Sequence, residues 1–246
     1  MVAYSFYNFK QSLSMKTRSE SAFTLIEMLV VISIIAVLAA FAVPALTSAL
    51  TKGQMTGTMN NGRQLYLAAQ QMALDGSANS DPSLAWPGDY APIPNLSAYM
   101  TFLVDNDYLK VGDVQKLLSG PGASAAVTSD NATPPTITVA GTSAFKIYPV
   151  TEADAANVIF AVSRNYDYDT ALAAAGAGGA PNNPFGQKGF VAQRKGGDAA
   201  ILRANNATVA LMGGDIARFE AQVGKKPGEA QGAVTNADPA NTLKQP

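Results

Sequence analysis

The run from Phe23 to Leu50 constrains this chain most, because it is apolar throughout apart from a few hydroxyl residues and one charged residue, Glu27. A helix rises about 1.5 Å per residue, so about 20 residues span the roughly 30 Å hydrocarbon core of a bilayer. An unpaired carboxylate in such a helix costs on the order of 2.5–3.5 kcal/mol at the centre and less toward the interface. The run predicts a membrane-spanning helix in which Glu27 needs a partner.

The segment before this run is basic, with Lys10, Lys16 and Arg18 against one acid, Glu20. Positive flanks stay in the cytoplasm, so we expect the rest of the chain on the far side of an inner membrane. A secretory signal peptide is one alternative, but its apolar region of about 7–15 residues is shorter than this run. A plain membrane anchor is a second alternative, and it leaves Glu27 without a purpose.

The stretch "AFTLIEMLVVISIIAVLAAFAVP" resembles the N-terminus of type IV pilins and of type II secretion pseudopilins. The resemblance implies that a prepilin peptidase cuts between Ala22 and Phe23, that Phe23 is then N-methylated, and that Pro44 kinks the helix. The family usually has Gly before the cut, so Ala22 implies slower cleavage. "KTRSESA" after Met15 resembles a typical leader start, which leaves Met1 and Met15 as alternative start codons.

The same resemblance gives Glu27 a partner. Cleavage before Phe23 frees an α-amino group, which is cationic below its pKa of about 8. In the family, this carboxylate pairs with the terminal amine of the neighbouring subunit inside a filament, where opposite charges attract strongly. We therefore expect Glu27 to set the register of assembly, with snorkelling into the headgroup region as the alternative.

Composition narrows the chemistry of the rest of the chain. It contains no cysteine and no histidine, so thiolate nucleophiles, imidazole bases and metal ligands of both kinds are excluded. The formal net charge is −1, which gives no basic footprint for nucleic acid. We predict no catalytic residue and no nucleic-acid partner.

No cofactor is predicted, although calcium is an alternative for acids on predicted turns: Asp167, Asp169, Asp198 and Asp215. We interpret these carboxylates as solvated. The adjacent pair of Lys225 and Lys226 is interpreted in the same way.

Apolar periodicity predicts one long helix over residues 24–73, bent or loosened near residues 44–57 and ending at Asp75-Gly76. A loop held to the core by Trp86 follows, and then a short helix within residues 96–111 that begins at Asn95 or Ser97. Alternation predicts strands at 136–139, 144–150 and 157–163, and a meander of strands at 189–195, 199–204, 208–213 and 216–221.

We therefore expect an α+β, pilin-like fold, in which a long N-terminal helix packs on a C-terminal antiparallel β-sheet. The predicted segments are a leader (1–22), a transmembrane or filament-core helix (23–50), an amphipathic helical half (51–76), a globular α+β domain (77–222) and a flexible tail (223–246).

The resemblance implies a structural subunit of a type II secretion pseudopilus or type IV pilus-like filament. Its partners would be other pilin-like subunits, the prepilin peptidase and an inner-membrane assembly platform. Its globular domain would be periplasmic before assembly. The alternatives are a minor pilin for adhesion or DNA uptake and a membrane-anchored periplasmic enzyme.

Overall fold

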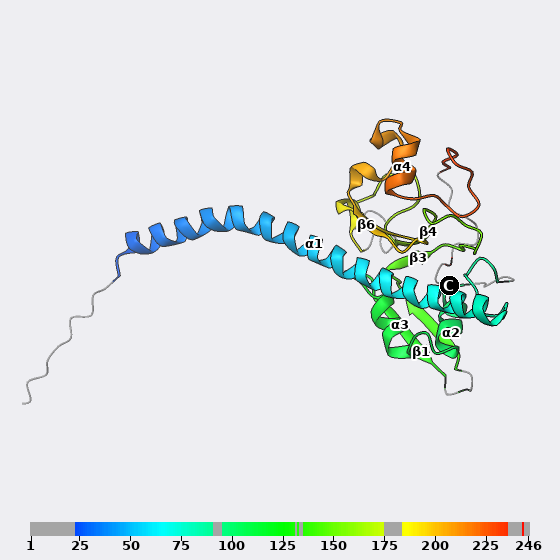
Figure 1. The fold of residues 1–246 in the computed structure, drawn as a ribbon. Coiled ribbons are helices and arrows are strands. Elements are labelled where there is room, and N and C mark those ends of the chain that lie inside the picture. Colours follow the sequence, from blue (N-terminus) through cyan, green and yellow to red (C-terminus); the bar gives the residue numbers. More distant parts are fainter. Residues whose placement is uncertain are drawn as a thin grey trace, which may run out of the picture. The chain divides into compact units, whose positions relative to one another are not determined.

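The computed structural model describes residues 23–90, 95–130, 132, 135–174, 184–235 and 243. The chain divides into two compact units, Met1–Leu46 and Thr47–Pro246. The elements shown in Figure 1 are α1 (Leu25–Asn79), α2 (Leu96–Asp105), α3 (Val111–Leu118), β1 (Ala125–Ser129), β2 (Ile137–Gly141), β3 (Phe145–Ile147), β4 (Ile159–Ser163), η2 (Gly186–Lys188), β5 (Phe190–Arg194), β6 (Ala199–Leu202), η3 (Ala204–Asn206), η4 (Ala210–Met212) and α4 (Ile216–Gln222).

Helix α1 runs without a break in its helical assignment through Pro44 and through Gly53 and Gly57. Beyond Leu50 it becomes amphipathic, as the sequence predicts. Its buried positions recur three or four residues apart, which places them on one face of the helix. The buried residues are Thr51, Met55, Thr58, Gly62, Leu65, Tyr66, Ala68, Ala69, Met72, Ala73 and Gly76.

The end of α1 differs from the prediction. Gly76 lies inside the helix, where a Cβ atom would stand 1.7 Å from the carbonyl oxygen of Leu84. The left-handed residue is Ser80, with φ +53°, and the amide of Asp81 donates to the carbonyl of Gly76 at 2.9 Å. This six-residue closure is a Schellman motif. Gly76 thus allows close contact with the following loop, while Ser80 ends the helix.

The core around the second half of α1 contains Trp86, which is only 4% exposed. Its ring centroid lies 6.0 Å from that of Tyr66 and 5.9 Å from that of Phe160. Its indole nitrogen donates to the carboxylate of Glu152 at 2.7 Å. The loop is therefore pinned to the core by Trp86, as predicted.

Helix α2 begins at the predicted cap, where the side chain of Asn95 accepts from the amide of Ala98 at 2.9 Å. It ends sooner than predicted, because Asp107 adopts a left-handed conformation with φ +61°. The chain then forms α3, a helix that was not predicted from the sequence. α3 buries Val114, Leu117 and Leu118.

Two antiparallel sheets form the strand part of the second unit. One pairs β1 with β2, and the other has the order β3-β4-β5-β6. The three predicted strands before residue 164 and the first two of the meander are present. Every residue of β4 is buried, which shows that both faces of this central strand are covered. The α+β architecture predicted from the sequence is confirmed.

The last two predicted strands are wrong. Residues 210–212 form the 3₁₀ helix η4, and residues 216–222 form α4. The side chain of Asp215 caps α4 by accepting from the amide of Arg218 at 2.9 Å. Phe219 and Val223, four residues apart, are both fully buried. Phe219, which the sequence assigned to a strand, therefore lies on a buried helical face together with Val223.

Candidate processing and assembly site

The start of α1 contains the residues with predicted roles in processing and assembly. Phe23 is 76% exposed, and Ala22 lies outside the described residues. The amide and hydroxyl of Thr24 donate to one carboxylate oxygen of Glu27, Oε2, at 2.8 and 2.7 Å. The amide of Glu27 donates back to the Thr24 hydroxyl at 3.2 Å. This reciprocal pattern is a capping box.

The capping box gives Glu27 a role within its own chain. The first amides of a helix lack intrahelical acceptors, and the N-terminal end of the helix dipole favours negative charge. Glu27 satisfies both demands through Oε2. Among the described residues, its other oxygen, Oε1, accepts no hydrogen bond. The geometry therefore leaves one carboxylate oxygen for a donor from outside the chain.

Thr24 is the residue of this site that was not predicted from the sequence. The signal was present, because a Thr followed three residues later by Glu, just before an apolar run, is the pattern of a capping box. The resemblance carried by "FTLIE" implies roles for Phe23 and Glu27 but none for Thr24.

In the single chain, no other described part of the protein packs against the apolar run. All side chains from Phe23 to Leu50 are exposed, and Thr51 is the first buried residue of α1. α1 is long and apolar enough to cross a membrane, and the window that qualifies is 0% buried. An uncovered apolar surface of this size needs lipid or other protein around it. The hydroxyl of Ser33, within the run, is satisfied by the carbonyl of Leu29 at 2.7 Å.

The acids proposed for calcium serve separate purposes. Asp167 pairs with Lys146, and Asp198 pairs with Arg194. Asp169 accepts from the amide of Val209 at 2.8 Å, while Asp215 caps α4. Within the described part of the chain, no three acidic side chains converge as ligands for a metal ion. Calcium therefore gains no support from the positions of these carboxylates.

The interpretation of Lys226 as solvated is wrong. It is only 5% exposed, and its ammonium lies 5.0 Å from the ring centroid of Tyr168. It donates to the backbone oxygen and the hydroxyl of Thr235, at 2.8 Å each, and lies 3.8 Å from Glu229. The neighbouring Lys225 is half-buried and pairs through its backbone with Val158.

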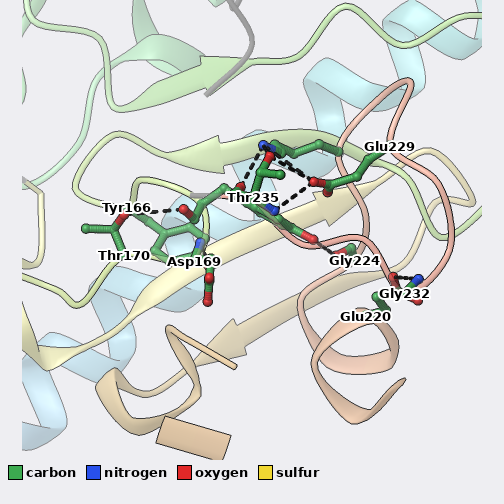
Figure 2. A network of polar contacts seen from close by, with 10 residues as sticks. Tyr166, Asp169, Thr170, Glu220, Gly224, Glu229, Gly232 and Thr235 are labelled. Atoms are coloured by element: carbon green, nitrogen blue, oxygen red, sulfur yellow. Dashed lines mark hydrogen bonds and ion pairs between the residues drawn. The ribbon is translucent and has the colours of Figure 1, made fainter. Parts of the chain in front are cut away.

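The segment after α4 is held by polar contacts, which differs from the predicted flexible tail. Figure 2 shows Glu229 and Thr235 facing each other, and Glu229 accepts from the amide and hydroxyl of Thr235 at 2.8 and 3.0 Å. Glu220 accepts from the amide of Gly232 at 2.7 Å. These bonds fasten residues 223–235 to the domain.

Tyr168 lies beneath this segment and donates to the carbonyl of Gly224 at 3.0 Å. Burial raises the pKa of Tyr168, and the negative charge of Glu229 raises it further. Its hydroxyl is therefore a permanent donor at neutral pH, which suits a structural role for this cluster.

Comparison with known proteins bears directly on the N-terminal site. Residues 17–43 match the family model described as the prokaryotic N-terminal methylation motif. This segment contains Phe23, Thr24 and Glu27. The N-terminal segment of the chain is therefore similar to that of type IV pilins.

Two relatives extend this similarity, and both are described as type IV major fimbrial protein FimA from Dichelobacter nodosus. One is 26% identical over 146 residues, which cover 59% of this chain and 73% of the relative. The other is 33% identical over 67 residues, which cover 27% of this chain and 43% of the relative. No solved structure shows a significant match.

Proposed function

We propose that this chain is a pilin-like protein and a structural subunit of a filament that assembles through its N-terminal helix. A prepilin peptidase cuts between Ala22 and Phe23, and Phe23 is methylated on its new amine. The subunit is held in the inner membrane by residues 23–50, with its globular domain outside the cytoplasm. Assembly partners are further pilin-like subunits on an inner-membrane platform.

The observation that carries this proposal is the combination of an uncovered apolar helix with one carboxylate at its beginning. Residues 23–50 are all exposed, and Glu27 keeps Oε1 without a hydrogen-bond donor among the described residues. In a filament, neighbouring helices would cover the apolar surface, and the amine of a neighbouring Phe23 would reach Oε1. A buried carboxylate left without such a partner would be strongly unfavourable.

The names of the two relatives favour a surface fimbria over a secretion pseudopilus for this chain, since both are described as major fimbrial proteins. Mass spectrometry of sheared surface filaments tests this distinction. Peptides of this chain as a main component support the fimbria. Their absence from the surface, with the chain in a periplasmic assembly, supports the pseudopilus.

The mature N-terminus tests the proposal as a whole. Intact mass and N-terminal peptides of the natively expressed chain should begin at N-methylated Phe23. A chain that keeps its leader, or one that begins beyond Phe23 because it was cleaved as a secretory signal peptide, contradicts the proposal. In either case no amine exists at Phe23 to pair with Glu27.

A further inference from the structure

Three cations line one groove on the second unit: Lys52 on α1, Lys188 at the end of η2 and Arg203 directly after β6. The groove also contains Ile201 and Leu202 of β6, together with Met55 of α1. These six residues define what is called the basic groove below. No carboxylate from the described residues lines it, although the whole chain has a net charge of −1.

The three cationic side chains are exposed. Among the described residues of the domain, they have no carboxylate partner. Over the described ranges, which omit residues 91–94, 175–183 and 236–242 among others, none of them forms an ion pair. Lys188 makes one side-chain contact, donating to the hydroxyl of Thr51 at 3.2 Å. By contrast, Lys146, Arg194 and Lys226 each pair with a carboxylate.

The lining of the basic groove is mixed: Ser48, Thr56 and Asn205 contribute polar groups beside the apolar side chains. Met55 and Leu202 are buried, and Ile201 is 40% exposed. A groove that combines three exposed cations with apolar side chains matches an amphipathic ligand with a negative head better than a small free anion. Lysine and arginine attract acidic lipids through charge, and exposed apolar groups favour contact with the interface.

The position of Lys52 in the chain places the groove near a membrane surface. Lys52 follows Leu50, the last residue of the apolar run, by two residues. Two residues reach at most about 7 Å even when fully extended. The polar layer on each side of the hydrocarbon core is roughly 5–8 Å thick. Lys52 therefore lies in or beside the headgroup layer when the apolar run ends at the edge of the hydrocarbon core.

We propose that the basic groove docks on the phosphate groups of anionic lipids in the leaflet where α1 leaves the membrane. This proposal rests on the membrane-held subunit of the proposed function. Docking would hold the second unit against the surface until the subunit enters a filament. A carboxylate surface on a second copy of the chain is the rival occupant, and the experiment separates the two.

The test uses the full chain in nanodiscs of phosphatidylcholine alone, or of phosphatidylcholine mixed with anionic phosphatidylglycerol. A water-soluble amine reagent modifies exposed lysines, and peptide mass spectrometry gives the rate at each site. Lys110 and Lys116, both exposed around α3, serve as internal references. Lys52 and Lys188 should react roughly fivefold more slowly in anionic discs, and 1 M salt should abolish the difference.

A matched pair of variants extends the test to Arg203. One variant combines K52Q, K188Q and R203Q, and the other combines K110Q, K116Q and R218Q, which removes three exposed cations elsewhere. Native mass spectrometry then counts phosphatidylglycerol retained by the detergent-solubilised chain. The first variant should lose its preference for phosphatidylglycerol over phosphatidylcholine, while the second should keep it.

Several outcomes would overturn the proposal. If the lysines react equally fast in both kinds of disc, the basic groove does not contact anionic lipid. Protection by inorganic phosphate in neutral discs identifies a site for free anions, and protection that needs two chains per disc identifies a second copy. A chain that does not enter the discs contradicts the proposed function instead, so the two failures are distinguishable.

Discussion

Gly76 of α1 lies so close to the carbonyl oxygen of Leu84 that the two backbone segments touch where every other residue type has a Cβ atom. The contact joins the end of the long helix to the loop that contains Trp86. The amide of Asp81 also returns to Gly76, so one residue fixes both the end of α1 and the start of the loop.

Replacing Gly76 with alanine should therefore destabilise the domain despite the better helix propensity of alanine. We expect a loss of about 2–3 kcal/mol, because the loop must move away from an added methyl group. Thermal and urea unfolding of the full chain in detergent, followed by circular dichroism, measures the change. Gly53→Ala is the control, because that position has no atom within 4 Å. It should gain up to about 1 kcal/mol, and equal effects of the two changes would contradict the contact.

Glu27→Ala should leave the chain processed and membrane-bound but unable to form filaments, because the neighbouring amine then loses its carboxylate. Sodium carbonate extraction, N-terminal mass spectrometry and electron microscopy of sheared material measure these three properties. Ser33→Ala, in the same apolar run, should assemble normally, since that hydroxyl bonds only within its own helix.

Glu27→Gln separates the two roles of this residue. The amide oxygen of glutamine still accepts from Thr24, so the capping box survives, but the negative charge is gone. Loss of filaments in this variant supports ionic pairing between subunits. Filaments as abundant as those of the unaltered chain would show that Glu27 acts only as a cap.

Lys226→Met should cost roughly 3 kcal/mol, because Glu229 then remains in a buried site without its cation. Unfolding of the full chain in detergent, monitored by near-ultraviolet circular dichroism of the buried tyrosines, measures the loss. Lys225→Met is the matched control and should change stability by less than about 0.5 kcal/mol. Adding Glu229→Gln to Lys226→Met should recover part of the loss, since the uncompensated charge is removed.

Tyr90 should make the domain sensitive to alkali. Burial raises the pKa of Tyr90 to about 12 from an ordinary value of 10.0, although the hydrogen bond that it accepts from the amide of Ala85 acts in the opposite direction. The neutral phenol is favoured in the folded state, so its stabilising contribution is complete below pH 10 and is lost as the pH rises through about 12. Tyr90→Phe should therefore show a shallower fall in the free energy of unfolding between these values. An unchanged slope would assign the alkaline transition to other tyrosines.

The parts of the fold that the sequence predicted well are those with one strong periodicity. α1 was recognisable because its apolar residues continue at helical spacing from the membrane run into the amphipathic half. β4 was recognisable because Val158, Phe160 and Val162 recur at every second position of a short run. In both cases, local propensity and burial favour the same structure.

The segment from residue 208 to 222 was predicted wrongly because short runs of mixed residues fit both periods. In "IARFEA", alternation suggested a strand. The segment is a helix because Asp215 caps its first turn and because Phe219 and Val223, four residues apart, are buried on one face. The environment of Lys226 was unpredictable for another reason. Its partners, Tyr168 and Thr235, come together only through tertiary packing. No sequence spacing encodes such a contact.

The isolated bridge between Leu243 and Ile147 affects how this domain meets other chains. The amide of Leu243 donates to the carbonyl of Ile147 at 2.9 Å, on the outer side of β3. A strand with bare edge groups recruits strands from other molecules. Truncating the chain before residue 243 would uncover that edge. The truncated chains would then tend to aggregate through β3, which the full-length chain prevents.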